Sequence, residues 1–200
     1  TRRSSDLSLD LVRDRIIHED GIVRVLLDRR GLSGDNWDVS KDNWSYEGLP
    51  LRILYSPCSA DHCYFVMMAS ADDTLHLTAP PDFALWRPSF PLLDELLLRK
   101  PIESRFDRYC STRLSAWTKG RAALIGDAAH AMPSSHGRGA NISIRTAVKL
   151  AHFLTSTDDI EEALTRWEAE LRPQVDEDQR EAEYLASSRS LHRGRPLLDL

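Results

Sequence analysis

The feature that most constrains this chain lies between Gly120 and Leu154, where an apolar run, a loop and a helical pattern follow one another. The run at residues 121–126 ends in glycine and predicts a buried strand. Small residues fill the loop from Asp127 to Gly139. The apolar positions at helical spacing after it are Ile144, Ala147, Val148, Ala151 and Leu154. This order of elements is typical of a ligand-binding edge in α/β proteins.

The residues at this edge favour a ligand that carries hydroxyl and anionic groups. Asp127 comes where the predicted strand opens into the loop, so its carboxylate is placed to meet a hydroxyl. Gly137 and Gly139 let the backbone approach a ligand closely, and the N–H groups at a helix start favour negative charge. The glycines form only the first half of a GxGxxG fingerprint, because Ile142 takes the last position. From these residues alone, a structural turn and a nucleotide-like cofactor loop are equally open.

The preceding residues predict an antiparallel sheet. Residues 51–55 and 63–69 are rich in strand-forming residues and are separated by a turn sequence, so we expect a hairpin. Residues 22–27 predict a further strand, and residues 102–117 predict a strand pair or one long strand. A short helical segment at residues 92–99 is opened and closed by prolines.

The residues after Leu154 predict a long second helix. Asp158 followed by Glu161 resembles a capping box, and we expect Pro173 to kink or interrupt the helix. Its expected apolar stripe consists of Ile160, Leu164, Trp167 and Leu171.

Composition narrows the classes of function. The net charge is −5 and the basic residues form no single patch, so we expect no nucleic-acid partner. No apolar run approaches the roughly 18 residues of a membrane span. Cys58, Cys63 and Cys110 are odd in number, and Cys58 with His62 and Cys63 gives no four-ligand set, so we expect no metal site. Reduced thiols in a cytoplasmic protein are the simplest interpretation.

The sequence from 117 to 141 also resembles a known family. Residues 117–133 are similar to the second flavin-binding motif of the class A flavoprotein monooxygenases, the relatives of para-hydroxybenzoate and salicylate hydroxylase. Residues 137–141 continue the resemblance, and residues 167–175 are similar to the closing helices of that family. Residues 51–116 fit its middle sheet only in outline.

The resemblance implies FAD as the cofactor, NADPH or NADH as the electron donor, and hydroxylation of a small aromatic or related organic substrate with O2. By resemblance, Asp127 would bond the ribityl chain of FAD and Pro133 would lie beside the reactive edge of the flavin ring. Gly139, Ala140 and Asn141 would present backbone N–H groups to its pyrimidine end. The expected cofactor-binding residues are Gly126, Asp127, Pro133, Gly137, Gly139, Ala140 and Asn141. His130 and His136 are the candidates for acid–base chemistry, but the resemblance implies a structural role at the position of His130, and no catalytic residue is assigned.

The chain also departs from the family pattern. Arg138 stands where glutamine is usual, and Arg145 with Thr146 replaces an acidic pair. The N-terminal βαβ unit, whose Gly-rich loop grips the ADP half of FAD, has no match in this sequence. We therefore expect an α/β (α+β) fold without that Rossmann unit. A partial substrate-covering sheet domain is expected at residues 1–116, and the C-terminal part of the FAD-binding domain with its closing helices at 117–200.

Two alternatives to a complete enzyme follow from the unmatched βαβ unit. In the first alternative the chain is a non-catalytic remnant that keeps the fold. In the second it is a half-enzyme that needs a separate N-terminal chain to bind FAD. A further candidate partner is a second copy of the chain, which would form a homo-oligomer.

Overall fold

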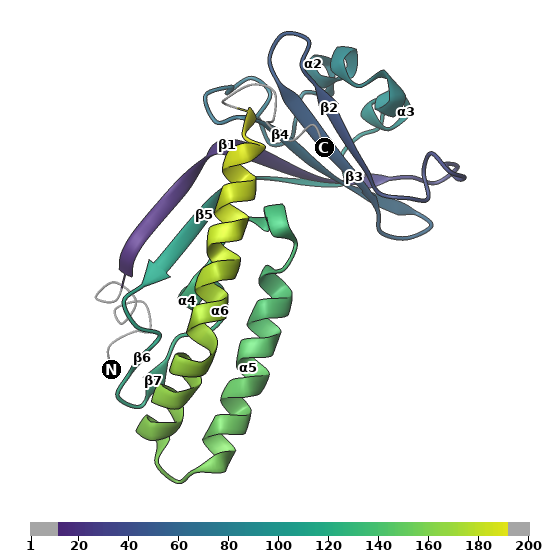
Figure 1. The fold of residues 1–200 in the computed structure, drawn as a ribbon. Helices are drawn as coiled ribbons and strands as arrows, with labels where there is room; N and C mark the ends of the chain where they lie inside the picture. Colours follow the sequence, from purple (N-terminus) through teal and green to yellow (C-terminus); the bar gives the residue numbers. More distant parts are fainter. Residues whose placement is uncertain (1–11, 192–200) are drawn as a thin grey trace. The chain divides into compact units, whose positions relative to one another are not determined.

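A computed structural model describes residues 12–191, and the chain divides into two compact units (Figure 1). Among the described residues, the helical unit comprises residues 12–18 and 109–187, and the sheet unit comprises residues 19–108 and 188–191. This division into compact units does not test the functional boundary expected after residue 116, which therefore stays a prediction. The outer ends of both expected domains lie outside the described residues.

The sheet unit is built on a five-stranded sheet with the order β2-β3-β4-β1-β5. The strands are β1 (Val12–Asp28), β2 (Lys41–Ser45), β3 (Leu51–Pro57), β4 (His62–Ser70) and β5 (Glu103–Leu114), and residues 12–18 of β1 and 109–114 of β5 belong to the helical unit. β3 pairs antiparallel with both β2 and β4, and β4 pairs antiparallel with β1. The predicted hairpin and antiparallel sheet are confirmed, and residues 102–117 contain one long strand rather than a pair.

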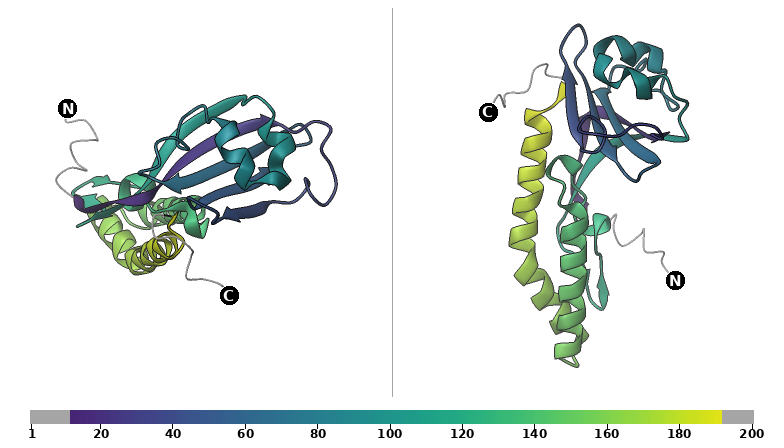
Figure 2. Two further views of the ribbon diagram at one scale, coloured as in Figure 1. Left: turned by 90° about the horizontal axis from the view of Figure 1, so that it is seen from above. Right: turned by 90° about the vertical axis from the view of Figure 1, so that its right-hand side faces the viewer.

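One face of the sheet carries the core of this unit. Alternate residues of β3 are fully buried, as a strand with one covered face requires. The short helices α2 (Phe83–Trp86) and α3 (Asp94–Leu97) lie against that face (Figure 2). The largest buried side chains of this core are Ile53, Tyr55, Phe65, Met67, Trp86 and Leu96.

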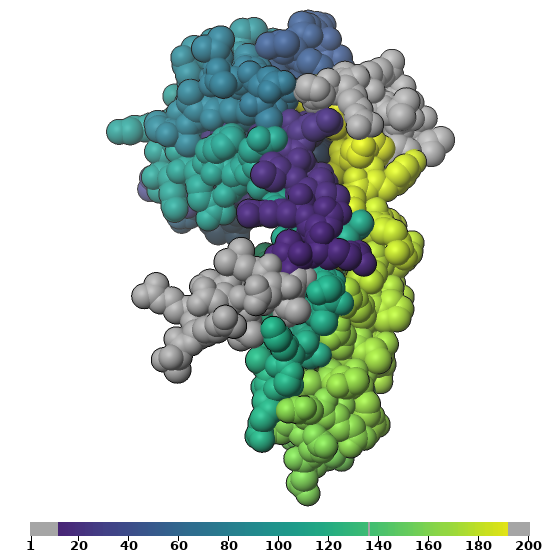
Figure 3. All heavy atoms as spheres, turned by 90° about the vertical axis from the view of Figure 1, so that its left-hand side faces the viewer, coloured from purple at the N-terminus to yellow at the C-terminus, as the bar shows by residue number. Residues whose placement is uncertain are grey.

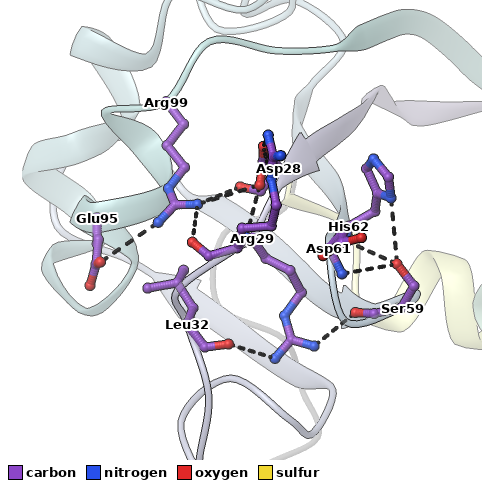
Figure 4. A network of polar contacts seen from close by, with 9 residues as sticks. Asp28, Arg29, Leu32, Ser59, Asp61, His62, Glu95 and Arg99 are labelled. Carbon is purple, nitrogen blue, oxygen red and sulfur yellow. Dashed lines mark hydrogen bonds and ion pairs between the residues drawn. The ribbon is translucent and has the colours of Figure 1, made fainter.

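A buried arginine joins the loops at one end of the sheet (Figure 4). The guanidinium of Arg29 donates to the backbone carbonyls of Ser59 at 2.9 Å and Leu32 at 3.2 Å. It also donates to the carbonyl of Trp37 at 2.7 Å and pairs with the Asp38 carboxylate. Such a residue supplies donors to loop carbonyls that burial would otherwise leave unsatisfied.

The helical unit consists mainly of α5 (Gly139–Ser156) and α6 (Ile160–Ser188), which lie side by side (Figures 1 and 2). Two short strands, β6 (Thr118–Lys119) and β7 (Ala122–Ala123), and the one-turn helix α4 (Asp127–His130) precede them. Its core contains Leu114, Trp117, Ala129, Ile142, Phe153, Ala163, Trp167, Leu171 and Val175.

α6 differs from its prediction in two details. The helix continues through Pro173, so the interruption is wrong and the kink stays a prediction. Asp159 rather than Asp158 caps it, because the Asp159 carboxylate accepts from the N–H groups of Glu161 and Glu162 at 3.0 and 3.1 Å. The predicted apolar stripe is confirmed at Leu164, Trp167 and Leu171.

The start of β1 has a different environment from its end. Its first residues are exposed and lie on the surface in Figure 3, whereas residues 20–23 are all buried and residues 24–28 alternate between half-buried and buried positions. No helix in the described part of the chain is long and apolar enough to cross a membrane.

Candidate functional site

A glycine turn places Asp127 at the start of α4. Gly126 has a φ of 59°, in the left-handed region where a residue with a Cβ is strained. A Cβ built on Gly126 would lie 3.7 Å from the hydroxyl of Ser143, in the first turns of α5. The Gly126–Asp127 turn and the beginning of α5 are therefore neighbours, which brings the two halves of the predicted site together. Asp127 itself is exposed.

The buried strand predicted at residues 121–126 is wrong. Only Ala122–Ala123 forms a strand, and it pairs solely with Thr118–Lys119 among the described residues. Leu124 is half-buried, and the side chain of Ile125 is 46% exposed. An apolar run is buried only where other residues cover it, and the described part of the chain leaves Ile125 uncovered.

The loop before α5 is held by α6. The side-chain amide of Gln179 donates to the carbonyl oxygen of Ala131 at 2.9 Å, and the hydroxyl of Ser135 donates to the carbonyl oxygen of Ala182 at 2.6 Å. Pro133 is buried between these two anchors along the chain. Gly137 ends the loop in the left-handed conformation, with a φ of 67°. The loop therefore has a fixed path, as a cofactor-binding loop needs.

The first turn of α5 has no side-chain cap. The helix begins at Gly139, and Arg138 at the N-cap position makes no side-chain capping hydrogen bond. The first N–H groups of a helix have no carbonyl partner within it, so those of Gly139, Ala140 and Asn141 are free to bind a ligand. Ala140 and Asn141 are exposed. Together with the helix dipole, these donors favour a negative group at this end.

His130 belongs to the core rather than to the ligand-facing surface. It is 2% exposed, and its ring lies 5.4 Å from the Trp117 ring between centroids. Its Nε2 has no hydrogen-bond partner among the described residues. Burial lowers the pKa of His130 below its ordinary value of 6.5, and the nearby Asp127 carboxylate only partly opposes this. A neutral packing role follows from this environment.

The structure also explains the two arginines that depart from the family pattern. Arg138 and Arg145 both approach the buried carboxylate of Asp178 on α6, at 3.7 and 3.5 Å. Asp178 could not be singled out from the sequence, because it is one of many acidic residues in this part of the chain.

Glu168 is a second residue that the sequence did not assign to a role. Its carboxylate accepts from the backbone N–H groups of Trp117 and Thr118, at 2.8 and 3.1 Å, and pairs with Arg172 at 2.6 Å. Glu168 and Arg172 thus fix the segment that leads to Gly126. Their place in the family-like stretch at residues 167–175 was the only available signal.

The apolar stripe predicted for α5 is not its buried face. Ile144 and Val148 are 66% and 65% exposed, and the buried positions of this helix are instead Ile142, Thr146 and Phe153. The pattern of apolar residues was correct, but the face chosen for the core of this unit was wrong. α6 packs on the other side, where the Trp167 indole donates to the carbonyl of Thr146 at 2.9 Å.

Comparison with known proteins agrees with this geometry. Residues 95–176, which include all seven predicted cofactor-binding residues, match the family described as FAD binding domain. The chain is a relative of the FAD-dependent aromatic monooxygenases. It is 33% identical over 189 residues to a 2-heptyl-3-hydroxy-4(1H)-quinolone synthase of Mycobacteroides abscessus, covering 83% of this chain and 50% of that relative.

Two further relatives extend the comparison. A phenazine 1,6-dicarboxylic acid hydroxylase, PhzS, of Lysobacter antibioticus is 36% identical over 161 residues, covering 71% of this chain and 38% of that protein. The tetrameric form of 2-methyl-3-hydroxypyridine-5-carboxylic acid oxygenase superimposes with a TM-score of 0.82 at 34% identity, covering 93% of this chain and 51% of that structure. The chain thus spans about half the length of these relatives or less, and its fold matches their C-terminal part.

Proposed function

We propose that this chain supplies the part of an FAD-dependent monooxygenase that faces the flavin ring and its ribityl chain. The observation that carries the proposal is the adjacency of the Gly126–Asp127 turn to the uncapped first turn of α5. One carries an exposed carboxylate suited to hydroxyl groups, and the other carries free N–H donors suited to an anionic ring edge. The residues present therefore fit one half of FAD.

The roles proposed for the individual residues follow from this fit. Asp127 accepts hydrogen bonds from the ribityl hydroxyls, and Pro133 packs beside the reactive edge of the ring. The N–H groups of Gly139, Ala140 and Asn141 stabilise negative charge at the pyrimidine end, by about 0.3–1 kcal/mol if exposed and nearer 2 kcal/mol if buried. The bound flavin supplies the redox chemistry with NADPH or NADH and O2, while the chain orients it and shapes its electrostatics.

The proposed substrate class is a small aromatic compound with a hydroxyl or keto oxygen attached to its ring. The name of one relative supports it, since that oxygenase acts on a hydroxypyridine carboxylic acid, and the name of another gives a hydroxyquinolone as the product. We further propose that the assembled enzyme works in the cytoplasm. We also propose that it is a homo-oligomer, because the hydroxypyridine oxygenase has a tetrameric form. The functional boundary proposed between the substrate-covering and flavin-binding parts remains at residue 116.

FAD affinity tests the ligand role of Asp127. In the FAD-loaded holoenzyme that contains this chain, Asp127→Ala should cost about 1.5–3 kcal/mol of FAD affinity, the range for a charge-assisted hydrogen bond. The side chain is exposed, so the melting temperature without FAD should change little. Unchanged FAD affinity would show that Asp127 is only a residue of the turn.

The isolated chain provides a second test, because the βαβ unit of the family has no match here. We expect its dissociation constant for FAD to be micromolar or weaker, about −8 kcal/mol or less favourable. Isothermal titration that gave nanomolar binding would contradict the view that this chain holds only half of the cofactor site.

A further inference from the structure

The segment that covers the sheet around α2 carries very little charge. Asp82 and Arg87 are its only Asp, Glu, Lys or Arg residues between positions 75 and 92, whereas 28% of the whole chain is charged. Both are already engaged. The Asp82 carboxylate accepts from the backbone N–H of Ala84 at 3.0 Å, and the Arg87 guanidinium donates to both oxygens of Asp94 at 2.6 and 3.1 Å. This segment therefore presents little unpaired charge to solvent.

The side chains that the segment exposes are mostly apolar. Leu75, Leu85 and Leu92 are 69%, 38% and 83% exposed. Between positions 84 and 92 every exposed residue is apolar, and this set consists of Ala84, Leu85, Pro88, Pro91 and Leu92. Single apolar side chains are common on protein surfaces, but a group of them on one layer marks an interaction site.

Hydrogen bonds join these residues into one layer. The Trp86 indole donates to the backbone carbonyl of His76 at 3.3 Å, which ties the turn that carries Leu75 to α2. The pair of Arg87 and Asp94 ties the end of α2 to the start of α3. The exposed residues lie on the side of this layer away from the sheet (Figure 2), because other side chains fill the core beneath it, namely Phe83, Trp86, Phe90, Leu93 and Leu96.

We propose that the surface of residues 75–92 binds a second copy of the chain, with the same surface of each copy in contact across a two-fold axis. This rests on the proposed function, in which the enzyme is a homo-oligomer, and it names the face that associates. In such an isologous contact a surface meets itself, so any unpaired charge would face a like charge. An apolar surface whose one arginine is already paired within the same copy avoids that repulsion, and the core of a protein interface is likewise depleted of charge.

The backbone of this surface is also rigid. Four prolines, at positions 80, 81, 88 and 91, fix the φ angle of their residues. Trp86 lies fully buried beneath the surface, and its ring stacks on that of Phe90 with 6.1 Å between centroids. A rigid surface loses little conformational entropy on association, so more of the apolar burial contributes to affinity.

The experiment measures the oligomeric state of the FAD-loaded holoenzyme that contains this chain, by sedimentation velocity over a dilution series. Leu92→Glu should raise the dissociation constant of this contact by about 100-fold or more, because the substitution puts a carboxylate into an apolar contact from both copies. Leu85→Lys should act in the same direction. Leu49→Glu is the matched control in the sheet unit, since Leu49 is 59% exposed and lies outside this surface, and it should leave the dissociation constant unchanged.

The high exposure of Leu92 means that Leu92→Glu should keep the fold and the bound FAD, and Leu85→Lys decides the question if it does not. The inference is overturned if the parent is monomeric throughout the dilution series, or if both variants keep the parent's assembly. Loss of FAD from an assembled parent would instead contradict the proposed flavin site, since none of the residues assigned to FAD belongs to this surface.

Discussion

The carboxylate of Asp178 on α6 lies 3.5 Å from the guanidinium of Arg145 on α5. Its other oxygen lies 3.7 Å from Arg138 at the N-cap of α5, and Gln174 is within 3.4 Å. The carboxylate is 6% exposed, whereas both guanidinium groups are about half exposed. Arg138 at the start of α5 is unfavourable for the helix dipole, and the acid that it shares with Arg145 on the neighbouring helix offsets this.

This shared acid predicts coupling between the two arginines. Arg138→Gln and Arg145→Gln should each cost little, because the remaining arginine still pairs with Asp178. The double variant should cost about 1–3 kcal/mol more than the sum, since it leaves a buried carboxylate with only Gln174 beside it. Urea unfolding of the four proteins measures the coupling.

The control for that cycle is the exposed pair of Lys149 and Glu170, at 2.9 Å. Both side chains are about half exposed, so the cycle of Lys149→Gln and Glu170→Gln should give a coupling below about 1 kcal/mol. Additive effects at Arg138 and Arg145 would show that Asp178 does not depend on them.

The elements of this fold could be predicted wherever the sequence pattern matched a local period. The hairpin of β3 and β4 and the stripe of α6 follow from alternation or helical spacing, whereas the pattern of residues 102–117 left a strand pair and one long strand open. The pattern could not tell which face of α5 is buried within the helical unit, because that depends on where α6 packs. Nor could it show that residues 124–126 lack a strand partner among the described residues.

The motif of the candidate site could be predicted from the sequence, but which of its residues are neighbours in space could not. The adjacency of Gly126 to Ser143 joins positions 17 residues apart in the numbering, and no spacing rule connects them. The anchors on α6, Glu168 and Gln179, lie still farther along the chain. They act on backbone groups, which carry no sequence signal.

A proline in the first turn of α5 tests whether that helix stabilises the reduced flavin. Ala140→Pro removes one N–H from the second helical position, where proline is tolerated. If the N–H faces charge that appears on reduction, the flavin potential should become more negative by tens of millivolts, about 30 mV corresponding to 1.4 kcal/mol in a two-electron couple. Ala140→Gly keeps the N–H and is the control. A variant that folds, retains FAD and keeps the parent's potential would contradict the assignment of this loop.

The three cysteines should differ in reactivity. Cys63 is fully buried in β4, and burial raises the pKa of its thiol to about 12, so it is neutral and shielded at pH 8. Cys58 is exposed and Cys110 is half-buried. Labelling with a thiol reagent should modify Cys58 first and Cys63 only after unfolding, with mass spectrometry of peptides as the measurement. Early modification of Cys63 in the folded protein would contradict the burial of that strand.

Acid sensitivity should trace partly to His130. Its folded-state pKa is below the ordinary value of 6.5 because burial disfavours the charged ring, so the unfolded chain binds the proton more readily. The free energy of unfolding should therefore be fully retained above about pH 6.5 and should fall as the pH drops from there toward the lowered pKa. Replacing the ring by an uncharged one of similar size, His130→Phe, should flatten this fall between pH 7.5 and 5, measured by urea unfolding at each pH. His152→Gln, at an exposed position on α5, is the control and should leave the parent's slope. An equal slope in the parent and His130→Phe would mean that the buried imidazole is not the group that acid titrates.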